Sequence, residues 1–423
     1  MGINLEFSGI DLDKSEMKWY NIAKIMLNGT ERAVNGLNGM NGSGKKKMAS
    51  PNRQMFRIVL AVLFMTLLVF AGTGWCSVFI LRSYHSVKAQ KVNLDFRHGD
   101  FYYNTLEDRL QALYNDAVNM CSSHIDVGDI LSYTYTEEEY QRVMEAVRSD
   151  CPNLFWLDYR RTEMICGKDK SRLHLRYLCS RTETRHMEQV LDGRLQSVAD
   201  ALTAEAGEDK AALAQAAHDW LVRNCRAAQD RESSYSSTVY GALVLGEASA
   251  EGYAAAYKLL LNRLGIYCLM LYGRVYTDDH VWNLVFLNGK YYHVDVMWDD
   301  PDLDYLPNLV SHAYYCLSDK QIEEERVIGR KSVLPAAESS RDYYRLAGTA
   351  WTADTLEAGL TEAVGGMLAN GETELQFSAD CPDEEVKAVL DRVLESLGTP
   401  SDSQLLRLSE NRHVYLLRLY AAE

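Results

Sequence analysis

The chain has 423 residues, of which 47% are apolar and 24% are charged, a globular composition with room for two or three domains. The formal net charge of -15 argues against a nucleic-acid-binding function, because phosphate binding requires clustered Lys and Arg side chains. We therefore predict no nucleic-acid partner, and we interpret the acidic runs at 137–139 and 323–325 as solvated helix faces.

The N-terminal segment indicates a tail followed by a membrane anchor. Residues 1–55 include repeated Asn-Gly pairs, which favour turns and flexibility over a packed core. The next stretch, residues 58–81, carries no charge over 24 residues, enough to cross a bilayer and too long for a cleaved secretory signal. We expect a transmembrane helix over 56–81, with a slight excess of Lys and Arg before it favouring a cytoplasmic N-terminus and extracytoplasmic C-terminal domains.

Residues 82–184 are predicted to form a linker and a small α+β unit. Helices are expected over 105–121 and 136–150, because apolar residues recur at helical spacing and Thr136 can act as an N-cap. Aromatic and alternating residues predict strands over 155–161 and 172–179.

The C-terminal segment, residues 345–423, has a similar order of predicted helices and strands. Two explanations of this similarity remain open: an internal duplication, or two ordinary α+β units that are unrelated to each other. The nine cysteines include Cys76 in the apolar run and form no Cys-x-x-Cys motif, so neither a zinc ribbon nor a redox motif is predicted. Disulfides and free buried thiols both remain open.

Between these units, residues 185–335 contain the strongest hairpin signal of the chain. Asn288-Gly289 lies between two runs of alternating aromatic and β-branched residues, a pattern typical of a two-residue type I′ turn. That turn sets Leu287 opposite Lys290 and, further along, Trp282 opposite Asp295.

The same register predicts a histidine–carboxylate pair. His280 and Asp295 lie on one face of the hairpin as diagonal neighbours, close enough for an imidazole to meet a carboxylate. The carboxylate can then select the tautomer and hold the ring. A plain core histidine is the alternative for His280.

A metal site with His293 is the other alternative. His293 lies opposite Leu284, four residues along the strand from His280. That separation exceeds about 13 Å, too far for both imidazoles to bind one ion. We therefore predict no metal site in this chain.

A helix is predicted over 250–264, and the turn before it directs the helix N-terminus toward the segment that packs against it. One apolar stripe runs along it, and Gly265 occupies the expected position after its end. The N–H groups and dipole of the first turn would stabilise a thiolate or an oxyanion, yet the first helical residue, Ala250, is chemically inert.

Three ordered motifs, at 249–254, 280–283 and 292–301, resemble those of the bacterial transglutaminase-like superfamily: Cys-x-Gly-Tyr-Ala, His-x-Trp-Asn and His-x-Asp-x-x-Trp-Asp. The resemblance is carried by residues 236–301 and is extended to 185–335. It implies a papain-like α+β fold, with a helix packed on an antiparallel sheet, and a Cys-His-Asp triad that cleaves, transfers or forms amide bonds. We expect no cofactor.

By motif position, His280 matches the family base, Asp295 matches its orienting acid, and the nucleophilic cysteine falls on Ala250. Tyr240, Ser249 and Trp282 are candidates for oxyanion or substrate contacts. For Ser249 we favour a role as helix N-cap over that of a substitute nucleophile. Cys225 and Cys268 lie outside the motifs and are interpreted as structural.

Two functions follow from this resemblance. One is a membrane-anchored pseudoenzyme that binds a peptide, protein or cell-envelope substrate without cutting it. The other is a cysteine hydrolase or acyltransferase in which alanine has replaced the catalytic cysteine at position 250.

Overall fold

The computed structural model describes residues 101–130, 133–229, 234–301, 309–399, 403–409 and 412–420. The tail predicted over 1–55, the transmembrane helix predicted over 56–81 and the first part of the linker lie outside these residues. Among the described residues, no helix has the length and apolar character needed to span a membrane.

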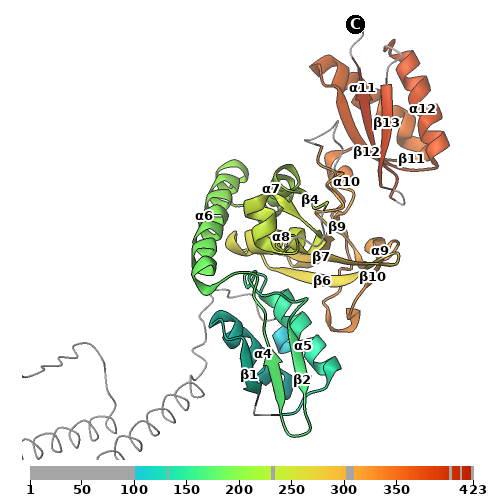
Figure 1. Ribbon diagram of the computed structural model, residues 1–423. Helices are drawn as coiled ribbons and strands as arrows, with labels where there is room; N and C mark the ends of the chain where they lie inside the picture. The colour runs from blue at the N-terminus through green and yellow to red at the C-terminus, as the bar shows by residue number, and fades with distance from the viewer. Residues whose placement is uncertain are drawn as a thin grey trace, which may run out of the picture. The chain divides into compact units, whose positions relative to one another are not determined.

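The N-terminal unit combines helices with a small antiparallel sheet (Figure 1). Its elements are α3 (Phe101–Asn104), α4 (Asp108–Ser122), β1 (Val127–Ile130), α5 (Glu137–Asp150), β2 (Glu163–Cys166) and β3 (Ser171–His174), with strand order β1-β3-β2. Both predicted helices form, and Thr136 caps α5 in a capping box with Glu139.

The strand predicted over 155–161 is wrong, because these residues form turns with a single isolated bridge at Leu157. The Asp158 carboxylate accepts a hydrogen bond from the backbone N–H of Arg160 at 3.1 Å and so closes the turn. Such local side-chain-to-backbone bonds compete with strand pairing. The strand predicted over 172–179 forms only in its first part, as β3.

The central unit places helices against a five-stranded antiparallel sheet of order β10-β6-β7-β8-β9 (Figure 1). Its helices are α6 (Arg181–Ala206), α7 (Lys210–Asn224), the π-helix η1 (Gly241–Leu245), α8 (Ala250–Arg263) and α9 (Asp319–Ile322). The sheet strands are β6 (Cys268–Val275), β7 (Asp278–Leu287), β8 (Lys290–Val294), β9 (Tyr315–Leu317) and β10 (Arg326–Ile328), beside a small parallel pair of β4 (Arg226–Ala227) and β5 (Glu247–Ala248).

The β7–β8 hairpin has the predicted register, with Leu287 opposite Lys290 and Leu284 opposite His293. Asn288 and Gly289 both have positive φ, 51° and 83°, as a type I′ turn requires. Ladder pairing ends at Val294, so the chain leaves the hairpin immediately before Asp295.

Helix α8 packs on β6 and β7 and is buried on nearly every side from Glu251 to Leu261. The sequence predicts one apolar stripe, and hence burial of one face, whereas the structure buries nearly all faces of this helix. Lys258, within the helix, is buried and donates to the carbonyl of Ser149 at 2.5 Å. As predicted, Gly265 adopts positive φ (72°) after the helix.

The C-terminal unit is a four-stranded sheet of order β11-β12-β14-β13 with two helices packed on one face. Its elements are α10 (Tyr343–Ala347), β11 (Ala350–Thr352), α11 (Ala353–Asn370), β12 (Glu374–Asp380), α12 (Asp383–Ser396), β13 (Ser403–Ser409) and β14 (Val414–Leu419), and a 3-10 turn (Lys331–Val333) precedes them. The β11–β12 pair is parallel, unlike any pair of the N-terminal sheet, so the two units differ in topology.

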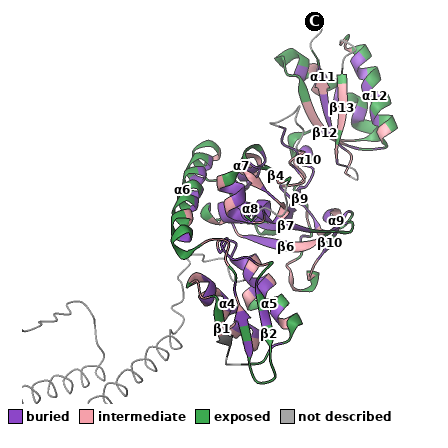
Figure 2. Cartoon of the chain, viewed as in Figure 1, coloured by how far each residue is buried: buried purple, intermediate pink, exposed green. Residues whose placement is uncertain are grey.

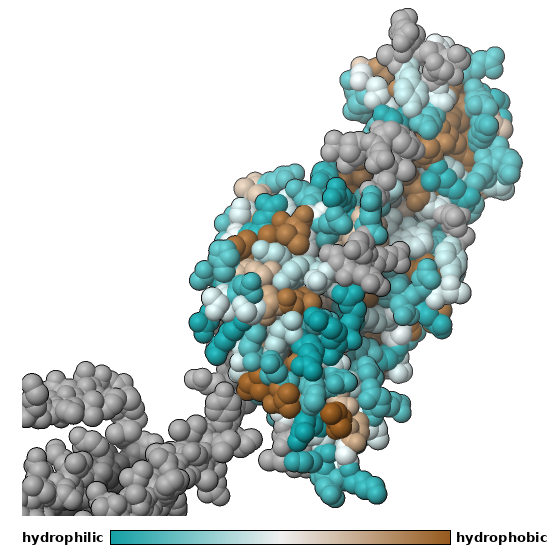
Figure 3. Space-filling view, in the orientation of Figure 1, coloured by the Kyte–Doolittle hydropathy of each residue, from teal (hydrophilic) through white to brown (hydrophobic). Residues whose placement is uncertain are grey.

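Burial is concentrated where helices meet sheets, as Figure 2 shows by its purple segments. One apolar cluster contains residues of the N-terminal and central units together, including Leu113, Val147 and Leu260. The phenol of Tyr102 also donates to the carbonyl of Met270 at 2.6 Å. The face in Figure 3 is largely hydrophilic with separate hydrophobic patches. The chain is thus a mixed α+β protein whose first two units share a core.

Two helical glycines give a matched stability test. A Cβ on Gly252 in α8 would lie 2.5 Å from the Ser236 carbonyl oxygen and 2.7 Å from the Ala248 Cβ, whereas a Cβ on Gly365 in α11 would meet nothing within 4 Å. We expect Gly252→Ala to destabilise the protein by about 1–3 kcal/mol through overpacking. Gly365→Ala should stabilise it by roughly 0.5–1 kcal/mol. Urea unfolding measures both, and effects of the same sign would contradict the packing described for α8.

Candidate functional site

His280 and Asp295 form the pair that the register predicts. His280 Nε2 lies 2.7 Å from Asp295 Oδ2, and both side chains are almost fully buried. Asp295 reaches this position after β8, where its backbone N–H donates to the carbonyl of Tyr314 at 3.1 Å. Because Nε2 faces the carboxylate, the other ring nitrogen, Nδ1, is the one left for chemistry at the site.

Arg326 is a third member of this site, which we did not predict from the sequence. Its Nη2 and Nε donate to Asp295 Oδ2 at 2.6 and 3.0 Å. Its guanidinium also lies over the rings of Trp298 and Tyr314, with centroids 4.7 and 4.3 Å away. Arg326 comes from β10, which pairs with the far edge of β6. No local pattern in the sequence signals that pairing.

The charges around Asp295 keep it ionised despite its burial. Burial by itself raises the pKa of this carboxyl, but the facing His280 and Arg326 outweigh it and lower the pKa to about 2. A carboxylate held in this way stabilises an imidazolium on His280 and fixes the ring orientation.

His280 is packed between aromatic rings. Trp282 stacks beneath it, with centroids 6.0 Å apart and ring planes 18° apart, and Trp298 meets it edge-on. Trp282 is itself buried and donates from Nε1 to His293 Nδ1 at 3.0 Å. The structure therefore places Trp282 behind His280 and not along the cavity. His293 is held on its other side by Asp319, at 2.8 Å, well apart from His280.

A cavity of about 910 Å³ brings together Ala250, at the N-terminus of α8, and His280. Both residues line it, as do Ser249, Met297 and Trp298. The N-terminal unit supplies the opposite wall, through Tyr140, Gln141, Met144, Glu145, Arg148, Tyr159, Arg160 and Thr162. The position that the resemblance assigns to the nucleophile thus shares a cavity with the predicted base.

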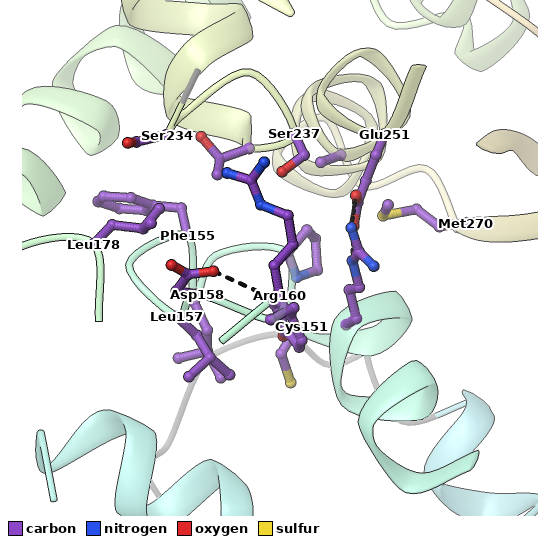
Figure 4. A pocket seen from close by; sticks show the side chains of 16 residues that line it. Cys151, Phe155, Leu157, Asp158, Arg160, Leu178, Ser234, Ser237, Glu251 and Met270 are labelled. Carbon is purple, nitrogen blue, oxygen red and sulfur yellow. Dashed lines mark hydrogen bonds and ion pairs between the residues drawn. The ribbon is translucent and has the colours of Figure 1, made fainter. Parts of the chain in front are cut away.

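Glu251, directly after Ala250, anchors the start of α8 to the N-terminal unit. Arg148 of α5 forms a bidentate ion pair with the Glu251 carboxylate, and the Tyr272 hydroxyl donates to the same carboxylate at 2.8 Å. Arg148 and Glu251 both line a smaller adjoining pocket. Figure 4 shows Glu251 at one side of that pocket, and Arg160 extending toward the segment that carries Ser237. The orientation of α8 at the cavity therefore depends on α5.

Ser249 and Tyr240, the other candidates for oxyanion or substrate contacts, lie in different surroundings. Ser249 occupies the N-cap position of α8, but its side chain makes no capping bond. Its hydroxyl donates instead to the carbonyl of Ser236 at 3.3 Å, because that segment runs directly alongside. Tyr240 stacks on Phe155 at 5.3 Å and is not among the described residues that line the cavity.

The cysteines of the described residues offer no substitute nucleophile at this site. None of the eight cysteines in this part of the chain lines the cavity with Ala250 and His280. Burial raises the pKa of the Cys225 and Cys268 thiols to about 12, which suppresses the reactive thiolate. Their interpretation as structural residues agrees with this environment.

One cluster of side chains away from the cavity has the composition of a metal site. A ligand atom of each of His218, Asp219 and His312 lies within 4.8 Å of the others. No local sequence pattern predicts this cluster, because His218 and Asp219 belong to α7 whereas His312 comes from a distant loop.

The ionised state of Asp295 predicts a loss of stability in acid. Its pKa is lowered from 3.8 to about 2, so its contribution is fully present above pH 3.8 and is lost as pH falls toward 2. We expect it to be on the order of 2 kcal/mol. Urea unfolding from pH 5 to 2 should show a smaller acid loss for Asp295→Asn than for the unsubstituted chain. An exposed control, Asp354→Asn, should retain the full loss, and equal slopes in all three proteins would refute the assignment.

Comparisons with known proteins give a family for the central unit. The family model described as "Transglutaminase-like superfamily" matches residues 196–296, a segment that includes Ala250, His280 and Asp295. None of the curated proteins matches the chain.

Solved structures with some likeness include a transglutaminase, with 9% identity, a TM-score of 0.24, and coverage of 39% of this chain and 48% of that one. A provisionally assigned cysteine protease from Cytophaga hutchinsonii has 13% identity, a TM-score of 0.21, and coverage of 33% and 54%. A provisionally assigned protease from Parabacteroides distasonis has 14% identity, a TM-score of 0.20, and coverage of 32% and 35%.

The chain thus spans about half the length or less of these solved structures, and scores this low do not bear on its activity. The match of the family model agrees with the three motifs and with the packing of α8 on an antiparallel sheet. Residues 196–296 of this chain therefore belong to the transglutaminase-like superfamily.

Proposed function

We propose that the cavity between α8, β7 and the N-terminal unit binds an amide-containing substrate without forming a covalent bond to it. The observation that carries this proposal is the shared cavity of Ala250 and His280. The methyl group of Ala250 occupies the position at which an acyl-transfer reaction of this superfamily needs a nucleophile. Loss of the nucleophile leaves binding and oxyanion effects alone, so the chain as written is a pseudoenzyme.

The dimensions of the cavity suit a peptide, a protein segment or a peptide-bearing cell-envelope component. Its volume of about 910 Å³ is at the upper end of ordinary ligand pockets. Its lining combines aromatic rings with charged groups of both signs, including Arg160, Asp278 and Asp279. Such a lining favours a polar, extended ligand over a purely apolar one.

A second candidate is an active hydrolase or acyltransferase of the same family with cysteine at position 250. The observation that favours it is the intact group of His280, Asp295 and Arg326. Burying such charges is costly, and a simple binding cavity does not require them. With cysteine at 250, the thiolate would attack the amide carbonyl and the C–N bond would break. His280 would protonate the leaving amine, and water or a second amine would release the acyl group from the thioester.

The location of this cavity is part of the proposal. Residues 58–81 anchor the protein in a membrane as an uncharged run of 24 residues, and residues from about 82 onward face the extracytoplasmic side. Both statements rest on sequence alone, and cell fractionation with alkaline extraction tests the first of them.

Restoring the nucleophile tests the geometry of the site. In Ala250→Cys, we expect iodoacetamide at neutral pH to alkylate the new thiol about tenfold faster than in Ala250→Cys/His280→Ala. The reason is that the imidazole and the N-terminus of α8 together favour the thiolate. Alkylation rates measured by mass spectrometry at the peptide containing residue 250 give the comparison.

The unsubstituted chain supplies the background for this measurement, because it contains other cysteines, of which Cys166 is exposed. Equal rates in the single and double variants would overturn the proposed site. Amine release from a denatured protein substrate then separates the two functions. If Ala250→Cys releases amine and the double variant does not, the chain is an enzyme of this family in which alanine has replaced the catalytic cysteine. If the thiol of Ala250→Cys is alkylated rapidly but no amine is released, the chain is a binding protein.

A further inference from the structure

A second polar centre lies outside the cavity, where α7 meets the loop that precedes β9. His218 Nδ1 lies 2.9 Å from Asp219 Oδ1, and His312 Nε2 lies 2.8 Å from the same oxygen. The two imidazole rings have centroids 5.2 Å apart. None of these residues lines the cavity that contains Ala250 and His280, so the proposed function makes no use of them.

The donor atoms match those that a divalent transition metal prefers. Two imidazole nitrogens and one carboxylate oxygen lie within 4.8 Å of one another. Such nitrogen and oxygen donors suit Zn²⁺ and neighbouring first-row ions. Three protein ligands leave a fourth coordination position for water, as in zinc sites that are not fully enclosed.

Asp299 provides the outer support that metal-bound histidines ordinarily have. Its Oδ2 lies 3.1 Å from His218 Nε2, the ring nitrogen that faces away from Asp219. Its Oδ1 accepts the backbone N–H of Tyr314 at 2.9 Å, so the carboxylate is fixed in place. A carboxylate on the outer nitrogen of a histidine fixes the tautomer that offers its other nitrogen to a metal. The ring of His312 is held separately by Tyr343, stacked at 3.7 Å.

The balance of charge also favours a cation at this centre. His218 and Asp299 are fully buried, and Asp219 is largely buried. Both ring nitrogens of His218 face carboxylate oxygens, and among the described residues no Lys or Arg side chain bonds to either carboxylate. Two carboxylates held out of water without a Lys or Arg partner are costly, and a divalent cation bound between the imidazoles and Asp219 would offset that cost.

The centre is accessible to an ion from one side. Asp219 also lines a surface hollow of about 290 Å³, whose other polar lining residues are Glu205, Gln215, Trp220, Arg223 and Asn224. Oxygen-bearing side chains in that hollow give an incoming hydrated ion partners before it reaches the imidazoles.

From this arrangement we infer that His218, Asp219 and His312 bind one divalent first-row transition-metal ion, with Asp299 as the supporting carboxylate. The ion ties α7 to the loop before β9. The inference goes beyond the proposed function, because it concerns neither position 250 nor the amide substrate.

Zn²⁺ titration of the full-length, chelator-treated protein tests this site. Isothermal calorimetry should show one equivalent of Zn²⁺ bound. His312→Gln and Asp219→Asn should weaken binding by about 100-fold or more, and Asp299→Asn by roughly 10- to 100-fold. The control is His293→Gln, since His293 is also buried and paired with a carboxylate yet lies outside the cluster. It should leave the affinity unchanged.

A spectroscopic measurement on the unsubstituted chain keeps the test independent of how the variants fold. Co²⁺ bound at the site should give visible d–d absorption without a thiolate charge-transfer band, because nitrogen and oxygen are the ligands. Absence of stoichiometric Zn²⁺ binding, a thiolate band, or undiminished binding by folded His312→Gln would each overturn the inference. The cluster would then be a hydrogen-bond network without metal.

Discussion

The ion pair between Arg326 and Asp295 is the constraint on which the site depends. Asp295 has just left the hairpin ladder, and its partners come from several segments, among them His280 of β7, Arg326 of β10 and the Tyr314 carbonyl before β9. Removing one partner from a buried ion pair typically costs about 3–5 kcal/mol. The pair therefore couples the orientation of the imidazole to the assembly of the whole sheet.

The N-terminal unit imposes the second constraint. Arg148 of this unit, together with Tyr272 of β6, fixes Glu251, the residue after Ala250. Lys258, further along α8, donates to a carbonyl at the end of α5. These bonds and the shared apolar cluster hold α5 in place as one wall of the cavity. A change of ligand preference can therefore arise in the N-terminal unit without any change in the three motifs.

The two polar centres of the central unit are built in different ways. At the cavity, the Asp295 carboxylate is paired with the guanidinium of Arg326 and the imidazole of His280, and the Glu325 carboxylate lies 3.4 Å from the same guanidinium. At the α7 centre, two carboxylates face the imidazoles without an Arg or Lys among the described partners. A positive charge is thus built into the first centre, whereas the second is suited to receive one from outside. Trp-Asp-Asp at 298–300 joins them, because Trp298 borders the cavity and Asp299 supports the second centre.

The sequence by itself determined the features that follow from short repeating patterns. Asn288-Gly289 and the alternation around it fixed the register of the hairpin and hence the meeting of His280 with Asp295. Apolar spacing and Gly265 located α8, and the three motifs placed Ala250 at its start. These features depend on backbone dihedrals and on periods of about two and 3.6 residues, which neighbouring residues set directly.

Only the tertiary structure decided which distant segments meet. The contact of Arg326 with Asp295, the wall formed by α5 and the approach of His312 to α7 each join residues far apart in the chain. The same is true of Ser249, whose hydroxyl was diverted from capping by the segment at Ser236. Such contacts follow from the order of strands in the sheet and from the packing of whole elements, which no local period encodes.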